Sequence, residues 1–226
     1  MMYRACICVS LLPIALVCGQ ATAAPTSYSG SLTTADNGLL GTGDWVKDPD
    51  HDVTFSWVIT QNSDSTWHYW YKFDSTDIQG DISHLVIETS STFMANDIFN
   101  DVPSVEDGGP DSHGAANGNP NIPETVFGLK FQNPGGAVMT VEFDSPRDPV
   151  WGDIFAKGGA GTGGELWNAG FTSPDSDPTD PPADYSVGFH VLRPDSTTST
   201  IPAPGAVFLC ALGAGLVAQW RRRRSL

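Results

Sequence analysis

The chain has 226 residues and a formal net charge of −15 at pH 7. All 26 acidic residues lie between two hydrophobic ends, and this central part (25–195) holds only six of the 11 Lys and Arg residues, so its own charge is roughly −20. Such a charge opposes binding to nucleic acid and to anionic lipid, and no nucleic-acid partner is expected. It favours solubility, divalent cations or basic partners, and a plain solvated acidic surface is the alternative interpretation.

The first 23 residues (1–23) have the pattern of a secretory signal peptide. Arg4 supplies a positive charge, and the stretch 5–19 is almost wholly apolar. The small residues Ala21 and Ala23 then fit a cleavage site for signal peptidase, which is an expected partner. An N-terminal anchor that is never cleaved is the alternative.

The cysteines are confined to the two ends of the chain. Cys6, Cys8 and Cys18 lie in the predicted signal peptide, and Cys210 lies in the C-terminal apolar run. The central part therefore has no disulfide, no thiol nucleophile and no cysteine metal site. Its length is sufficient for one domain with an ordinary packed core.

Alternation of apolar and polar residues predicts strands in the central part. In 52–60, Val53, Phe55 and Trp57 share one face, and 67–73 repeats the pattern after a polar turn at 61–65. A period of two residues is typical of a half-buried strand, so these segments predict a β-hairpin.

Further short strands are expected at 28–33, 84–89, 126–131, 137–143, 150–156 and 186–192, and a short helical turn at 93–99. Two long loops rich in Asp, Gly, Asn and Pro are expected at 100–121 and 158–182, and loops of this length are often functional. No long amphipathic helix is indicated. The pattern predicts an all-β domain of the β-sandwich or jelly-roll kind over 25–195.

Three carboxylates alternate just before the first hairpin. Asp48, Asp50 and Asp52 offer the hard oxygens that calcium prefers, which makes calcium the one candidate cofactor. The spacing is not that of an EF-hand, because Val53 stands where that loop needs glycine. A solvated acidic turn is the alternative. A weaker candidate of the same kind is formed by Asp175, Asp177, Asp180 and Asp184.

The densest aromatic cluster lies on the second strand of the hairpin. On a strand, Trp67, Tyr69 and Tyr71 face one way, and His68 and Trp70 face the other. Exposed aromatic rings stack on sugars in many binding modules, so Trp70 and His68 are candidate glycan contacts. Aromatic packing between strands is the commoner role of such residues.

Sequence signatures of enzymes are missing. The chain has neither a G-x-S-x-G nor an H-E-x-x-H motif. Residues 159–164 match G-x-G-x-x-G, but no helical pattern follows them. A pair of carboxylates suited to glycoside hydrolysis is not informative in a chain with 26 acidic residues. A non-enzymatic protein is therefore expected.

The C-terminal end has three parts. A Ser/Thr/Pro linker (196–204) leads into the motif Ile201-Pro202-Ala203-Pro204-Gly205, and an apolar run (206–220) follows. As a helix this run is about 22 Å long, and the four arginines that follow it can extend it by snorkelling. Their charge predicts that segment 205–226 spans a membrane with its end in the cytoplasm. These are Arg221, Arg222, Arg223 and Arg224.

This tail resembles the bacterial PEP-CTERM sorting signal, with Ala203 in the place of the name-giving glutamate. The resemblance implies export across the inner membrane of a Gram-negative bacterium and handling by an exosortase-type membrane enzyme. It also implies a place on the cell surface or in a matrix associated with exopolysaccharide, which is a further expected partner. An ordinary single-pass anchor that is never cleaved is the alternative.

Four internal segments are also similar to segments of other exported PEP-CTERM-bearing proteins, which implies one exported domain but no particular chemistry. They are 84–88, 118–123, 149–157 and 191–194. The first expectation is thus a non-enzymatic protein of the cell surface or extracellular matrix. A carbohydrate-binding module is the alternative, and a secreted hydrolase is the third.

Overall fold

The computed structural model describes residues 26–46, 48, 50–78, 81–133, 135–159, 164–173 and 186–194. The predicted signal peptide, the linker, the sorting motif and the membrane span all lie outside these residues. Among the residues that are described, no helix has the length and apolar character needed to cross a bilayer.

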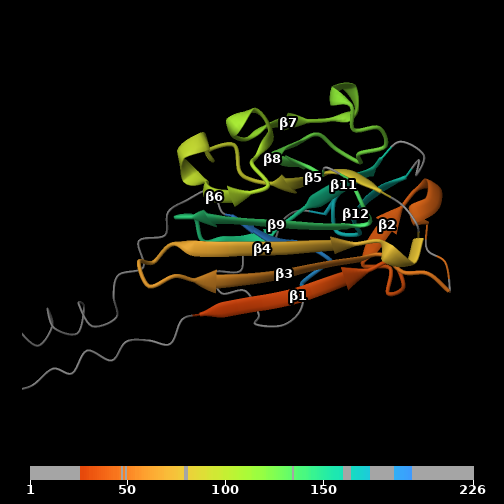
Figure 1. The fold of residues 1–226 in the computed structure, drawn as a ribbon, viewed down its shortest axis with the longest axis horizontal. Coiled ribbons are helices and arrows are strands. Elements are labelled where there is room, and N and C mark those ends of the chain that lie inside the picture. The colour runs from red at the N-terminus through yellow and green to blue at the C-terminus, as the bar shows by residue number, and fades with distance from the viewer. Residues whose placement is uncertain are drawn as a thin grey trace, which may run out of the picture.

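The described chain is all-β, and its main strands form two antiparallel sheets (Figure 1). The five-stranded sheet has the order β1 (Ser27–Thr33), β3 (Thr54–Gln61), β4 (Trp67–Asp74), β9 (Val138–Ser145), β6 (Phe99–Val102). The six-stranded sheet has the order β2 (Leu39–Gly41), β12 (Glu165–Asn168), β11 (Ile154–Gly158), β5 (Ile82–Glu88), β8 (Val126–Gln132), β7 (Asp111–His113). A separate small pair consists of β10 (Pro149–Gly152) and β13 (Val191–Pro194).

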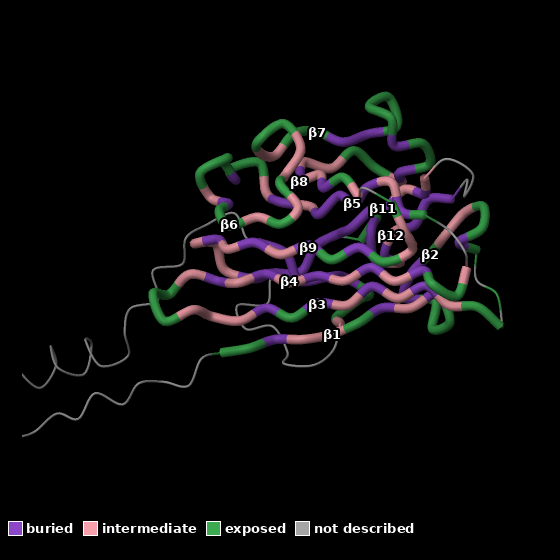
Figure 2. Tube along the Cα trace, in the orientation of Figure 1, coloured by how far each residue is buried: buried purple, intermediate pink, exposed green. Residues whose placement is uncertain are grey.

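The aromatic residues of the hairpin form the centre of the core. Along β4 buried and half-buried residues alternate, and the buried set includes Trp67, Tyr69 and Tyr71, as the period of two predicts (Figure 2). Phe143 on β9 stacks against Tyr69 at 5.1 Å and against Phe131 of the other sheet at 5.9 Å. The two sheets therefore pack face to face, and the architecture is sandwich-like.

A second, smaller core covers the outer face of the six-stranded sheet. Val86 on β5 and Phe155 on β11 pack there against Ile122 and Phe171, which come from the segments after β7 and β12. The strands in the middle of this sheet are thus buried on both faces, which explains why β5 has four consecutive buried residues.

Two of the predicted strands differ from the structure. The segment 150–156 is not one strand, because the chain bends at Asp153 and passes from β10 to β11, which belong to different sheets. The predicted strand 186–192 begins only at Val191, after a turn in which Phe189 has a positive φ of 60°.

The prediction of two unstructured loops was wrong in part. The segment 100–121 contains most of β6, all of β7 and the 3-10 helices η4 (Glu106–Gly108) and η5 (Ala115–Asn117), and 158–182 contains β12. These strands have three or four residues, which is too short for an alternating pattern to be visible. The predicted helical turn at 93–99 is confirmed as η3 (Ala95–Asp97). The remaining 3-10 helices are η1 (Gly43–Trp45) and η2 (Thr76–Ile78).

Candidate functional site

The outer face of the five-stranded sheet carries the predicted glycan residues. Trp70 is half-buried there and lies between Val58 of β3 and Glu142 of β9. Val58 is 39% exposed, and Val102 of β6, opposite Glu142, is 59% exposed. The structure therefore places Trp70 in a row of outward-facing side chains across the sheet, and this row is partly apolar.

His68 lies on the same face, held by two acidic side chains. Its Nδ1 is 2.9 Å from Asp144 Oδ1, and its Nε2 is 3.7 Å from Glu142 Oε2. Burial raises the pKa of Asp144, but hydrogen bonds from Asn100, His68 and Asn62 outweigh it and lower the pKa overall. The carboxylate therefore stays charged and fixes the imidazole beside the neighbouring Trp70.

Two of the three predicted calcium ligands have partners of their own. Asp48 accepts a hydrogen bond from the backbone N of Asp50 at 2.8 Å, which is the main cause of its lowered pKa, and lies 3.4 Å from His51 Nδ1. Asp52 instead accepts from Thr34 Oγ1 at 2.7 Å and from the backbone N of Ala35 at 3.0 Å.

The described part of the chain contains no group of three or more His, Cys, Asp or Glu side chains arranged to hold a metal ion. Calcium at this acidic turn stays a prediction, and binding would require Asp48 and Asp52 to exchange their present partners. The weaker candidate at 175–184 lies outside the described residues.

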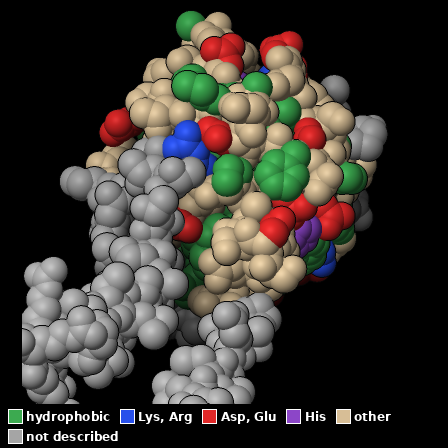
Figure 3. Space-filling view, turned by 90° about the vertical axis from the view of Figure 1, so that its left-hand side faces the viewer, with side chains coloured by type: hydrophobic (Ala, Val, Ile, Leu, Met, Phe, Trp, Pro, Cys, Tyr) green, Lys and Arg blue, Asp and Glu red, His purple; other side chains and the backbone are tan. Residues whose placement is uncertain are grey.

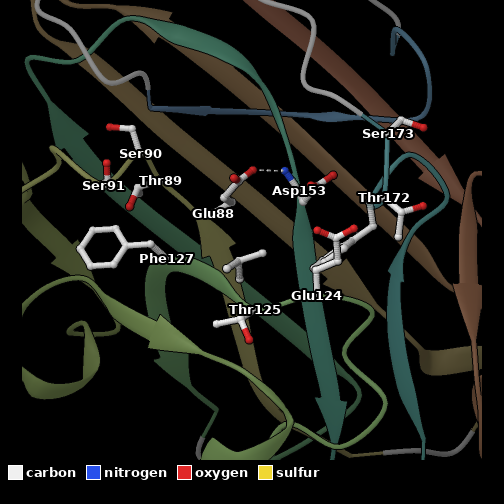
Figure 4. A pocket seen from close by; sticks show the side chains of 12 residues that line it. Glu88, Thr89, Ser90, Ser91, Glu124, Thr125, Phe127, Asp153, Thr172 and Ser173 are labelled. Atoms are coloured by element: carbon white, nitrogen blue, oxygen red, sulfur yellow. Dashed lines mark hydrogen bonds between the residues drawn. The ribbon is translucent and has the colours of Figure 1, made fainter.

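A polar groove, absent from the sequence-based expectations, opens beside the ends of β5 and β11 (Figure 4). Its volume is about 500 Å³. The walls carry the carboxylates of Glu88, Glu124 and Asp153, together with hydroxyl groups of serines and threonines from three separate segments. These segments follow β5, precede β8 and follow β12.

A buried polar network fixes two of these carboxylates. Glu88 Oε2 accepts a hydrogen bond from the backbone N of Asp153 at 3.0 Å and lies 3.4 Å from Arg193 Nε. Asp153 Oδ1 accepts from Asn168 Nδ2 at 2.7 Å and lies 3.2 Å from His190 Nδ1.

Burial makes this network costly to build and rigid once it has formed. Asp153, Asn168, His190 and Arg193 are each at most 6% exposed. Buried ionisable groups need well-placed partners, and each member here meets at least one. The groove therefore has acceptor groups whose positions are set by the strands beneath them.

Side-chain contacts on the six-stranded sheet also join segments that are far apart in the sequence. His84 Nε2 lies 2.8 Å from Asn119 Oδ1, and Lys157 Nζ donates to the backbone oxygen of Gly118 at 2.8 Å. The pair Glu88–Arg193 joins β5 to β13. No spacing along the sequence connects these segments, so a sequence pattern could not have grouped them.

No protein-family model matches the chain, and neither does any curated protein or solved structure.

Proposed function

We propose that the chain is an exported, non-enzymatic protein of the cell surface or extracellular matrix, sorted through its PEP-CTERM-like tail. The order of segments carries the proposal: an apolar leader, an acidic domain without cysteine, and an apolar run that ends in four arginines. The described strands begin at Ser27 and end at Pro194, so a β-sandwich domain fits between the predicted cleavage site and the linker. Acidic side chains outnumber basic ones on the face in Figure 3, in accord with a soluble exported domain.

Replacement of the four terminal arginines by serine tests the sorting step. Moving arginine through hydrocarbon is costly, so the four arginines should keep the end of the tail in the cytoplasm until the tail is processed. In a Gram-negative host with an exosortase we expect the serine variant to show weaker membrane retention and less processing, and a four-lysine variant to behave like the wild type. Equal retention and processing of the serine variant would remove the basis of the proposal.

Carbohydrate binding is the second candidate function, because Trp70 lies on an outward face beside His68 and the exposed Val58. Affinity electrophoresis in neutral and acidic polysaccharides tests it. Trp70→Ala should abolish retention of the chain while its unfolding transition stays nearly unchanged. Val138→Ala, at a position 40% exposed elsewhere on the same sheet, is the matched control. Equal retention of the wild type and Trp70→Ala would reject this face as a glycan platform.

A further inference from the structure

Most of the residues that line the groove beside β5 and β11 carry groups that exchange hydrogen bonds. Besides three carboxylates, six of its lining residues are serine or threonine. Glu124 is exposed and has no hydrogen bond or ion pair with any described residue. The lining contains no lysine or arginine. Such a surface offers many acceptors and hydroxyls to a ligand but no cation to hold an anionic one.

One hydroxyl on the wall of the groove lacks a partner. Thr89 is 2% exposed, and its Oγ1 makes no hydrogen bond within the described part of the chain. It stands beside Ser91 in Figure 4. A buried hydroxyl without a partner is costly, and a ligand with hydroxyl groups of its own can supply the missing bond after a small local adjustment.

The groove also has an apolar part. Val126 is half-buried and Phe171 is buried; both line the groove, and they pack together in the smaller core. Together with the fixed acceptors Glu88 and Asp153, this apolar part suits a molecule that has hydroxyl edges and an apolar C–H face. These are the two surfaces of a sugar ring.

We infer that this groove binds a neutral sugar chain. Carboxylates accept hydrogen bonds from the ligand hydroxyls, Val126 and Phe171 contact the apolar face, and the negative charge of the lining excludes uronates and phosphates. The buried pairs Glu88–Arg193 and Asp153–His190 hold the acceptors in place before the ligand arrives. The inference does not depend on the sorting tail, and it places the site on the opposite sheet from Trp70.

A glycan array with neutral, amine-bearing and uronate oligosaccharides tests the inference on the full chain purified in detergent. We expect neutral oligosaccharides to bind and uronates not to bind. For the best neutral ligand, Glu124→Gln should weaken binding at least about tenfold, because hydrogen bonds to charged groups are the strong ones. Ser91→Trp, at an exposed position on the wall, should abolish binding by filling the groove.

Asp36→Asn removes an exposed acidic side chain outside the groove; it is the control and should not change the affinity. Trp70→Ala tests the other candidate platform separately. The inference is overturned if no neutral glycan binds, if uronates are preferred, or if calcium alone binds at Glu124. It is also overturned if Trp70→Ala abolishes binding while Ser91→Trp does not. None of these outcomes affects the proposal on sorting, which has its own test.

Discussion

At the scale of single residues, His84 is the clearest source of pH dependence. It is 4% exposed and makes a hydrogen bond to Asn119, and burial lowers its pKa from 6.5 to about 4, with Lys130 and Lys157 acting in the same direction. The neutral imidazole is therefore favoured in the folded state. As the pH falls below 6.5, His84 is protonated in the unfolded chain but stays neutral in the folded chain. The free energy of unfolding therefore decreases between about pH 6.5 and 4.

We predict that His84→Gln flattens this part of the pH profile. A pKa shift from 6.5 to about 4 corresponds to a decrease of about 3 kcal/mol in the free energy of unfolding. Chemical denaturation at a series of pH values would measure this decrease. Some pH dependence should remain, because burial also lowers the pKa of His113. Parallel profiles for His84→Gln and the wild type would contradict the prediction.

Two neighbouring tryptophans should differ strongly in their effect on stability. Trp67 is 4% exposed, stacks on Tyr28 at 5.7 Å and donates from Nε1 to Asp148 at 2.8 Å. Trp67→Ala should therefore lower the free energy of unfolding by about 3–5 kcal/mol. Trp70→Ala should lower the free energy of unfolding much less, because Trp70 lies on the outer face of the sheet. Urea denaturation would compare them, and equal losses would contradict the assignment of the two faces.

At the scale of elements, the bend between β10 and β11 determines how the sheets and the groove are joined. Gly152 ends β10, and a Cβ at this position would meet Arg193 Nε and would come within 2.6 Å of Glu88 Oε2. Gly152→Ala should therefore push this ion pair apart and destabilise the chain by about 1–3 kcal/mol. Gly159→Ala, which would meet Asp81 Cβ at 3.2 Å, is the milder control. Thermal unfolding would compare them, and an equal effect of both substitutions would contradict this role of the bend.

The elements also show what the sequence could predict. β3 and β4 were found because each has one buried and one outward face, which gives a period of two. β7 could not be predicted, because its three residues are too few to show an alternating pattern and only their backbone pairing with β8 makes them a strand. The groove could not be predicted, because Glu88, Glu124 and Asp153 come from distant segments and only the fold brings them together.

At the scale of the whole molecule, the excess of acidic residues makes calcium the natural ligand to test. If Asp48, Asp50 and Asp52 bind it, millimolar calcium should raise the midpoint of thermal unfolding through mass action. Asp50→Ala should remove the rise, and it is the most informative variant because Asp52 also caps the end of β1 through Thr34. Identical midpoints with calcium and with chelator would reject a structural site at this turn.

The fate of the two ends of the chain tests the central claim, which is export and sorting, most directly. Mass spectrometry of the protein recovered from outside exosortase-bearing Gram-negative cells would identify both termini. We predict a chain that begins at Ala24, after the cleavage site at Ala23, and ends before the apolar run 206–220. An intact chain that begins at Met1, keeps its four terminal arginines and stays inside the cell would contradict the account.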